Sequence, residues 1–368
     1  MQRRIKVIIS GGGTGGHIFP ALAIANALKE MNTDNEILFV GALGRMEMEK
    51  IPAAGYKIIG LDIRGFQRKI SVTNLSFPFK VISSLTKAKK IIKEFKPDAA
   101  VGVGGYASGP LLWAATSSKI PSIIQEQNSF PGITNRLLAK RVQKICVAYE
   151  GMEKFFPAKN IIMTGNPVRQ DIANTTGKEM QAAEFFRLDR NKKMLLVIGG
   201  SLGARTINES IVAGIEKLNG AGIQLIWQTG KSYFEKAKAF ASANIKVYDF
   251  IKEMDLAYAA ADMVISRAGA LSVSELCLVG KPVIFVPSPN VTADHQVKNA
   301  MTLAKKNAAL IVRDAEAMEK LVGEVLILIQ SDAKRKSLSQ NIAALAKKDS
   351  ALKIAEIIYD LVEKHYTL

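Results

Sequence analysis

The strongest constraint on the fold is a pattern that occurs twice, in which short runs rich in β-branched residues alternate with helix-forming segments. The expected strands are residues 5–9, 37–40, 99–103, 122–125 and 144–148 in the first series, and 194–198, 225–228, 245–248, 263–266 and 283–286 in the second. Such buried runs, separated by patterned helices, are typical of βαβ units with parallel sheets. We therefore expect an α/β fold with two doubly wound domains.

Length and punctuation divide this pattern into two domains. A chain of 368 residues, 48% of them hydrophobic, is sufficient for two ordinary cores. The Gly and Pro of GNPVR, residues 165–169, mark the expected junction. We expect domains over 1–165 and 166–349 that face each other across a cleft, because ligands bind beyond the carboxyl ends of the strands in such sheets.

The sequence GGGTGGH, residues 11–17, follows the first expected strand and precedes a helix. Its glycines let the backbone approach a ligand closely, and the helix N-terminus directs unpaired N–H groups and partial positive charge toward that ligand. His17 adds a side chain that exchanges protons near neutral pH, although it could equally be a structural residue that hydrogen-bonds the loop. We expect an anionic or oxygen-rich ligand at this loop.

Two strand-to-helix turns in the second half repeat this arrangement. GGSLGAR at 199–205 and SRAGALSVSE at 266–275 each place a glycine-containing loop between a strand and a helix. Their backbone amides can face a diphosphate. Glu275 lies about one and a half turns into its helix, where it can accept both hydroxyls of a ribose or, alternatively, only interact favourably with the helix dipole.

Three standard motifs fit these loops incompletely. Residues 11–16 match G-x-G-x-x-G, but the second expected strand lacks the acidic residue that holds the ribose of a dinucleotide, and no Lys-Ser or Lys-Thr follows to make a P-loop. Ser201 lies in G-x-S-x-G, with Asp262 and His295 downstream in the chain order of an α/β-hydrolase. That interpretation leaves the first glycine loop unexplained.

Positive charge is the unusual feature of the composition. Fifty Lys and Arg against 33 Asp and Glu give a net charge of +17, which favours nucleic acid, anionic lipid headgroups or phosphorylated substrates as partners. Cys146 and Cys277 lie in apolar runs, as do buried thiols of a reducing compartment, and neither has a metal-ligand neighbour. Without a signal peptide or a bilayer-spanning run, we expect a cytoplasmic protein that is soluble or peripheral.

Basic and aromatic residues gather between residues 64 and 95. From Leu85 onward, helical spacing favours an ordinary amphipathic helix. The aromatic turn Phe77-Pro78-Phe79, with Arg68 and Lys69 nearby, favours contact with an anionic membrane surface. Aromatic side chains would enter the interface there, and cations would meet the headgroups.

The ordered set of motifs resembles the MurG family of transferases, which add N-acetylglucosamine to lipid I in peptidoglycan synthesis. The matching strings span about residues 5–300 and are GGGTGGH at 11, GVGGYASGP at 102, EQNSFPGITNR at 126, GNPVR at 165, GGSLGAR at 199, SRAGALSVSE at 266 and DHQVKNA at 294. The resemblance implies the GT-B fold, with two Rossmann-like doubly wound domains facing an interdomain cleft. It also implies a C-terminal helix at about 350–365 that crosses back to the first domain.

The resemblance further implies the reaction and its partners. N-acetylglucosamine passes with inversion from UDP-N-acetylglucosamine, held by the second domain, to the 4-hydroxyl of the N-acetylmuramic acid of lipid I, giving lipid II. It implies a peripheral protein on the cytoplasmic face of the inner membrane, a cell-wall synthesis complex as a partner, and no nucleic acid. We expect no cofactor and no metal, because helix N-termini and Arg169 can stabilise the charge on the departing UDP.

The functional residues of the family carry over by motif. Residues expected to contact the donor are Thr14, Gly15, Gly16, Asn128, Arg169, Ser201, Ile251, Ala270, Leu271, Ser272, Val273, Ser274, Glu275 and Gln296. Residues expected on the acceptor or membrane side are Tyr106, Phe77, Phe79, Arg68 and Lys69. We expect His17 to be the general base or its close partner, with Glu126 as the alternative.

Two positions depart from the family pattern. Gln125 stands where the family often has histidine, so catalysis at that position cannot rest on an imidazole. Leu202 replaces a glutamine, which removes a side-chain amide contact but leaves the backbone amides. Two other functions stay open: a catalytically silent protein that binds a sugar nucleotide or lipid carrier, and a hydrolase that uses Ser201.

Overall fold

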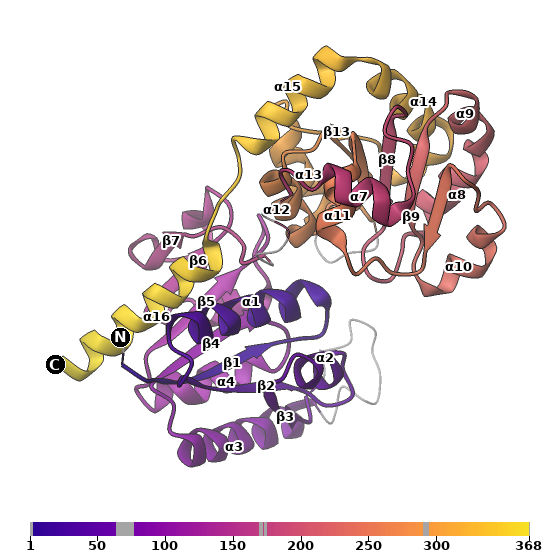
Figure 1. Ribbon diagram of the computed structural model, residues 1–368. Coiled ribbons are helices and arrows are strands. Elements are labelled where there is room, and N and C mark those ends of the chain that lie inside the picture. Colours follow the sequence, from indigo (N-terminus) through magenta and orange to yellow (C-terminus); the bar gives the residue numbers. More distant parts are fainter. Residues whose placement is uncertain (1–2, 64–76, 169–171, 173–174, 290–293, 368) are drawn as a thin grey trace. The chain divides into compact units, whose positions relative to one another are not determined.

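The chain folds into two compact units, each with its own sheet and core (Figure 1). The computed structural model describes residues 3–63, 77–168, 172, 175–289 and 294–367, with only the backbone for 77–79. Unit 1 comprises Met1–Val168 and Asp349–Leu368, and unit 2 comprises Arg169–Lys348.

Unit 1 is built on a seven-stranded parallel sheet with the order β3-β2-β1-β4-β5-β6-β7. Its strands are β1 (Lys6–Gly11), β2 (Glu36–Ala42), β3 (Lys57–Leu61), β4 (Ala99–Gly104), β5 (Ser122–Glu126), β6 (Lys144–Val147) and β7 (Ile161–Met163). Its helices are α1 (Gly15–Met31), α2 (Glu47–Ala53), α3 (Phe77–Phe95), α4 (Ser108–Ser117), α5 (Ile133–Leu138) and α16 (Ser350–Thr367).

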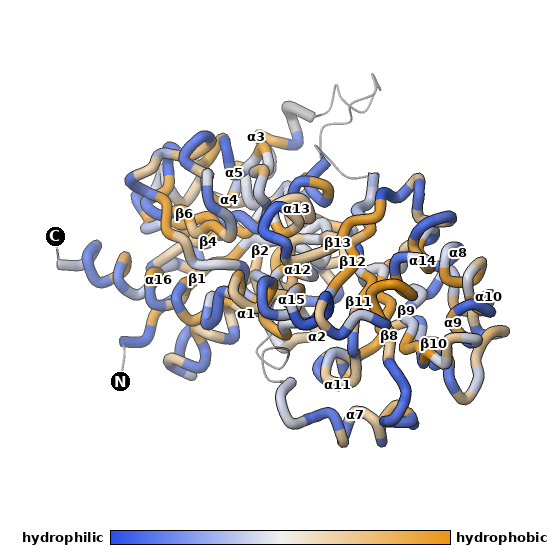
Figure 2. Tube along the Cα trace, turned by 90° about the horizontal axis from the view of Figure 1, so that it is seen from above, coloured by the Kyte–Doolittle hydropathy of each residue, from blue (hydrophilic) through white to orange (hydrophobic). Residues whose placement is uncertain are grey.

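The central strands of this sheet are buried on both faces. Successive side chains point to opposite sides of the sheet, and helices cover both sides. Val7 and Ile9 of β1 pack with α1, α2 and α16, whereas Ile8 belongs to the cluster formed with α3, α4 and α5. The hydrophobic colour in Figure 2 follows the strands of both sheets. The continuous apolar runs in the sequence therefore mark strands covered by helices on both sides.

The last helix of the chain completes unit 1. Ile354 and Ile358 are fully buried in the cluster that contains α1 and β1, and α16 lies beside α1 in Figure 1. The Tyr359 hydroxyl and the Asn35 side chain, 324 residues apart, exchange hydrogen bonds of 2.7 and 3.0 Å. The segment after residue 349 thus supplies part of the core of a unit that begins at the N-terminus.

Unit 2 repeats the architecture with a six-stranded parallel sheet of order β10-β9-β8-β11-β12-β13. Its strands are β8 (Met194–Ile198), β9 (Gln224–Gln228), β10 (Ile245–Tyr248), β11 (Met263–Ser266), β12 (Val283–Phe285) and β13 (Leu310–Ile311). Its helices are α7 (Glu179–Phe186), α8 (Arg205–Ala213), α9 (Ile215–Gly220), α10 (Lys231–Lys238), α11 (Met254–Ala260), α12 (Ala270–Val279), α13 (His295–Ala304), α14 (Ala317–Gln330) and α15 (Asp332–Ala343). Residues of α8, α9, α10 and α14 pack on one face, and those of α7, α11, α12 and α13 on the other.

All ten expected strands are present, with bounds that differ by at most two residues. In the described ranges, three further strands were not expected: β3, β7 and β13, and each lies at an edge of its sheet. One local expectation was wrong. The segment Phe77-Pro78-Phe79 is not a turn before a helix but the start of α3, where a proline is tolerated because first-turn N–H groups have no intrahelical acceptor.

Candidate functional site

The loops singled out in the sequence follow the strands at which the order of each sheet reverses. In unit 1, β1 leads toward β2 on one side and β4 on the other, and in unit 2, β8 and β11 diverge in the same way. Loops after such a pair of strands leave the sheet in opposite directions and form the usual ligand crevice of doubly wound sheets. Each unit therefore carries one candidate site at the carboxyl edge of its own sheet.

In unit 1, the glycine loop leads directly into α1 with Thr14 as the exposed N-cap. Gly15 and Gly16 form the first turn of that helix, so their amides lie among those that have no intrahelical acceptor. His17 is half-buried, and its Nδ1 lies 2.9 Å from the Gly12 carbonyl oxygen. A carbonyl only accepts, so Nδ1 carries the proton and Nε2 of the neutral ring presents a lone pair.

The loop after β4 packs closely on this glycine loop. Gly104 and Gly105 adopt φ of +109° and +89°, and a Cβ placed on Gly105 would lie 2.5 Å from the Gly12 oxygen. A Cβ on Gly104 would lie 2.8 Å from Nε2 of His17. Glycine is therefore required at both positions, and the backbone of Gly104 forms one wall beside the imidazole. Tyr106, at 47% exposure, stands next in the chain.

Glu126 lies at the end of β5 and is buried. Its carboxylate accepts hydrogen bonds from the Asn128 and Gly132 amides, both at 3.0 Å, and from the side chains of Asn128 at 3.2 Å and Asn135 at 2.8 Å. The carboxylate organises the loop that carries Asn128. This arrangement leaves its oxygens little opportunity to act as a base.

Gln125, at the position where histidine is common in the resembling family, is fully buried. Its Nε2 donates to the Asn166 side chain at 3.0 Å, and the Asn166 amide donates to the Gln127 carbonyl, also at 3.0 Å. Gln127 in turn donates to the Gln125 side chain. These three amides link the end of β5 to the GNPVR segment and so form a structural network.

In unit 2, the loop after β8 turns between Gly200 and Gly203, whose backbones form a 3.0 Å hydrogen bond. A Cβ on Gly203 would lie 2.0 Å from the Thr229 oxygen, so this loop packs on the end of β9. Ser201 is exposed and Leu202 is 75% exposed. The first-turn amides of α8 lie immediately after this loop, as an anion site requires.

The same candidate site of unit 2 includes the start of α12, with Gly269 as its N-cap. The amides of Ala270, Leu271 and Ser272 belong to the first turn, while the Val273 side chain is buried in the core and contributes only its backbone. The Ser274 hydroxyl donates to the Ala270 carbonyl at 3.0 Å. Gln296, on α13, accepts a hydrogen bond of 2.9 Å from the Ser288 amide, which fixes its side chain.

Glu275 has a buried partner that the sequence did not indicate. The hydroxyl of Tyr258, on α11, lies 3.2 Å from Oε2 of Glu275, and Tyr258 is fully buried. Burial, together with the charge of Glu275, raises the pKa of Tyr258 well above its ordinary value. The phenol therefore remains protonated and donates to the carboxylate, which is half-buried at the surface of the site.

Ile251 is buried, and its amide donates to Oε1 of Gln228 at 2.9 Å. The Nε2 of Gln228 donates to the Gly200 carbonyl at 3.1 Å. One side chain thus joins the segment at Ile251 to the loop after β8. Sequence reasoning missed Gln228, since a glutamine at the end of a strand gives no local signal of such a bridge.

The hydrolase interpretation of Ser201 is wrong on geometry. Asp262 precedes β11 and accepts a 2.7 Å hydrogen bond from the amide of Met194, the first residue of β8, whereas Ser201 follows the last residue of β8. A five-residue strand at about 3.3 Å per residue separates them by more than about 10 Å. The two side chains lie at opposite ends of the sheet and cannot belong to one triad.

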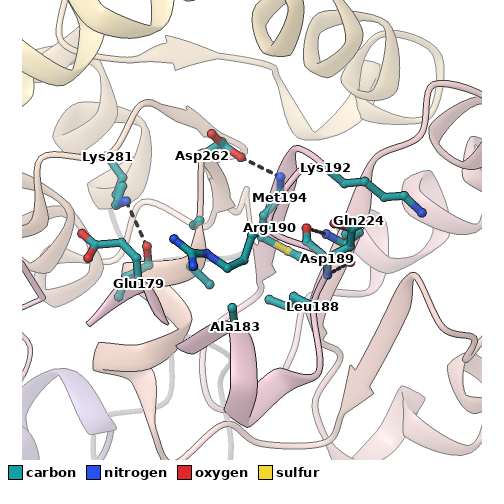
Figure 3. A pocket seen from close by; sticks show the side chains of 13 residues that line it. Glu179, Ala183, Leu188, Asp189, Arg190, Lys192, Met194, Gln224, Asp262 and Lys281 are labelled. Carbon is teal, nitrogen blue, oxygen red and sulfur yellow. Dashed lines mark hydrogen bonds between the residues drawn. The ribbon is translucent and has the colours of Figure 1, made fainter. Parts of the chain in front are cut away.

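A hollow of about 290 Å³ lies at that opposite, amino end of the unit 2 sheet, and Figure 3 shows the side chains that line it. Gln224 and Asp262 line it, together with Lys281, whose Nζ lies 3.4 Å from the Ala259 oxygen. Burial lowers the pKa of Lys281, while the charges of Asp262 and Glu179 act in the opposite direction. The hollow lies at the end of the strands opposite to the glycine loops.

Several expected residues fall outside the described part of the chain. Arg169, Arg68 and Lys69 lie in undescribed segments, and the side chains of Phe77 and Phe79 are likewise not described.

Cys146 and Cys277 are buried, as expected, and burial raises the pKa of each thiol to about 12. Within the described ranges, no helix is long and apolar enough to cross a membrane.

Comparison with known proteins finds relatives that match nearly the whole chain. Residues 7–147 match the glycosyltransferase family 28 N-terminal domain, and residues 194–354 match the family 28 C-terminal domain. A protein of Parabacteroides distasonis is 55% identical over 99% of this chain and 100% of its own length, and one of Cytophaga hutchinsonii is 56% identical over 98% of each. Both are named UDP-N-acetylglucosamine--N-acetylmuramyl-(pentapeptide) pyrophosphoryl-undecaprenol N-acetylglucosamine transferase.

Two solved structures share the architecture. The crystal structure of Acinetobacter baumannii MurG has a TM-score of 0.78 at 27% identity and covers 97% of this chain and 100% of its own. The glycosyltransferase of kitacinnamycin has a TM-score of 0.72 at 14% identity, covering 98% of this chain and 100% of its own, and is similar in fold alone.

Proposed function

We propose a glycosyl transfer for this chain, which belongs to glycosyltransferase family 28 and has the GT-B fold. It moves N-acetylglucosamine from UDP-N-acetylglucosamine to the 4-hydroxyl of the N-acetylmuramic acid of lipid I, giving lipid II for peptidoglycan synthesis. The observation that carries this proposal is the identity of more than half of the residues with transferases of that name, over nearly the full length of both chains.

The donor diphosphate binds to unit 2 in this proposal. UDP is a good leaving group, so the reaction needs stabilisation of the charge that builds on the diphosphate more than it needs a strong acid. The N-termini of α8 and α12 supply oriented amides and partial positive charge. Glu275 accepts hydrogen bonds from the ribose hydroxyls, Ile251 packs against the uracil and Gln296 contacts hydroxyls of the sugar.

Unit 1 supplies the base. Direct attack by the acceptor hydroxyl on the anomeric carbon inverts α to β and requires one group to take the proton. Nε2 of His17 serves, because the Gly12 carbonyl holds the proton on Nδ1 and leaves the other nitrogen as an acceptor. Glu126 serves instead as the organiser of the Asn128 loop, since its oxygens already accept four hydrogen bonds.

Radiolabel transfer from UDP-N-acetylglucosamine to a lipid I analogue tests the function. We expect a labelled product with the mobility of lipid II. UDP binding without any transfer would instead identify a catalytically silent binding protein.

We also propose that unit 1 docks on an anionic membrane surface. Four exposed apolar side chains lie on three helices of which α3 packs on α4 and α4 on α5: Ile82 (62% exposed), Trp113 (45%), Ile133 (68%) and Leu137 (70%). Exposed Arg136 and Lys140 accompany them, and the Arg141 guanidinium stacks 3.9 Å from the Trp113 ring centre. Apolar anchors beside cations are typical of interfacial binding. Docking places the enzyme on the cytoplasmic face of the inner membrane, beside its lipid-linked acceptor and a cell-wall synthesis complex.

Flotation with anionic liposomes tests this surface. Replacing Ile133 and Leu137 together by serine should reduce the bound fraction while leaving transfer to a short-chain soluble acceptor intact. Serine at exposed Met318 and Ile327 of α14, in unit 2, is the matched control and should leave binding unchanged. Equal binding by both double variants would contradict the proposal, and so would unchanged binding after replacement of Phe77 and Phe79 by serine.

A further inference from the structure

A buried carboxylate lies directly behind the glycine loop of unit 1. Glu47, the first residue of α2, is 1% exposed, although the segment RMEMEK resembles an ordinary charged surface helix. Its Oε2 accepts a hydrogen bond from the Gly13 amide at 2.8 Å, and its Oε1 accepts one from the Ala42 amide at 3.0 Å. The side chain thus joins the loop after β1 to the end of β2.

The surrounding backbone leaves room for this carboxylate and for nothing larger. A Cβ placed on Gly12 would lie 2.1 Å from Oε1 of Glu47, and one on Gly41 would lie 2.6 Å from its Cγ. Gly13 adopts φ of +86°, a conformation that turns its amide toward Glu47 and that L side chains rarely adopt. Gly12, Gly13 and Gly41 are therefore needed to accommodate the Glu47 carboxylate, in addition to any role in binding a ligand.

The same loop residue that Glu47 fixes also fixes the imidazole. Gly12 lies between the two contacts. Glu47 occupies the space beside the Gly12 Cα, and the Gly12 carbonyl accepts a hydrogen bond from Nδ1–H of His17. On the other side, the Gly12 amide donates to the Gly104 carbonyl at 3.3 Å. If the carboxylate is removed, one of these three restraints on the Gly12 peptide is lost.

We propose that Glu47 is a positioning residue for the transfer reaction: it holds the peptide of Gly12 and Gly13 so that the Gly12 carbonyl fixes the tautomer and direction of His17. This inference rests on the proposed role of His17 as the base.

The same contact also affects which ligand the glycine loop can bind. The Gly13 amide is already used by Glu47, and a buried negative charge behind the loop repels an anion in front of it. The loop consequently receives uncharged hydroxyls and leaves the diphosphate to unit 2.

The first test is Glu47→Gln, which keeps the size of the side chain but turns one acceptor into an N–H donor that faces a backbone amide. Misplacement of a catalytic group by about 1 Å costs about a hundredfold in rate, so kcat should fall by about tenfold to a hundredfold. KM for UDP-N-acetylglucosamine and the affinity for UDP should stay within about threefold, because the nucleotide binds to unit 2 in the proposed function. Glu49→Gln, an exposed glutamate on the same helix, is the matched control and should behave as the parent protein.

A spectroscopic measurement separates positioning from mere stability and does not depend on activity. The chain has only three histidines, so ¹⁵N signals of the ring nitrogens can be assigned to His17 with a His17→Gln variant. In the parent protein, neutral His17 should show a protonated Nδ1 and an unprotonated Nε2. In Glu47→Gln, the signals should move toward a mixture of tautomers.

If Glu47→Gln does not fold, a second perturbation leaves the glutamate in place. Gly12→Ala forces its Cβ against Oε1 of Glu47 and should by itself reproduce the loss of kcat and the mixed tautomer signals. Where Glu47→Ala folds, the double variant should be no worse than Glu47→Ala alone. Additive losses in this cycle, unchanged tautomer signals, or a loss confined to KM would overturn the proposal. Absence of transfer by the parent protein would refute the proposed function instead, and the tautomer measurement would still decide the role of Glu47.

Discussion

Replacement of Tyr258 by phenylalanine tests how unit 2 recognises the ribose. The hydroxyl of Tyr258 is buried and donates to Oε2 of Glu275 at 3.2 Å, so the carboxylate is already ordered before a nucleotide arrives. The substitution removes this one donor and keeps the ring that packs in the core. Any change in nucleotide binding then reports the orientation of Glu275.

Two free-energy terms set the expected size. Immobilising a side chain on binding costs at most about 0.5–1.5 kcal/mol. Loss of one contact that orders Glu275 should therefore weaken UDP binding in Tyr258→Phe by at most about tenfold. Hydrogen bonds to charged groups contribute about 1.5–3 kcal/mol to stability, but Glu275 is only half-buried and water can replace the phenol. We therefore expect the free energy of unfolding to fall by only about 1 kcal/mol.

Calorimetric titration with UDP and with 2′,3′-dideoxy-UDP is the assay. The loss should occur for UDP and be absent for the dideoxy nucleotide, which has no hydroxyls for Glu275. Tyr233→Phe is the control, since the Tyr233 hydroxyl is buried without a hydrogen-bond partner among the described residues. Equal weakening for both nucleotides, or none for UDP, would refute the idea that Tyr258 orders a ribose-binding carboxylate.

Three further predictions concern catalysis, pH and the core. His17→Ala should lower kcat at least tenfold with little change in donor KM, because positioned bases contribute about 10²–10⁴-fold, and a smaller loss in steady-state kinetics would exclude it as the base. The pKa of Asp255 is lowered: burial acts to raise it, but the 2.7 Å hydrogen bond from Lys178 and backbone amides outweigh burial. Its ionisation therefore adds stability above the unfolded-state pKa, which is lost as pH falls through the folded-state pKa. Urea unfolding should show Asp255→Asn less stable by about 0.5–1 kcal/mol at pH 7 and equal to the parent in acid below that pKa; a difference that persists there would contradict the argument. Ile358→Ala should destabilise unit 1 by about 2–5 kcal/mol, measured by urea unfolding, while UDP affinity stays unchanged; a weaker affinity would place α16 in the donor site.

All the central strands were predictable from the sequence, whereas of the four edge strands in the described residues only β10 was. A strand covered on both faces is mostly apolar, as in MLLVI at 194–198. An edge strand has fewer neighbours, so β7 is only half-buried or exposed and β13 has two residues. Short, partly polar runs of this kind do not stand out from the loops around them.

The candidate site divides in the same way. Glycine loops and helix N-termini were predictable because their chemistry is written in consecutive residues. Glu47, Tyr258 and Gln228 were not, because each reaches its partner from another element: Tyr258 is 17 positions from Glu275, and Glu47 is 34 from Gly13. Side chains that support a site from behind leave no pattern in their own segment.

The position of α16 imposes an order on folding during synthesis. Chains emerge from the ribosome N-terminus first, and domains generally fold as units as they emerge. The first unit here lacks Ile354, Ile358 and the Tyr359 partner of Asn35 until almost the entire chain has been made. Its α1 face stays open to water meanwhile, whereas all strands of the second unit are already present. The half of the protein that is translated first is therefore the half that is completed last.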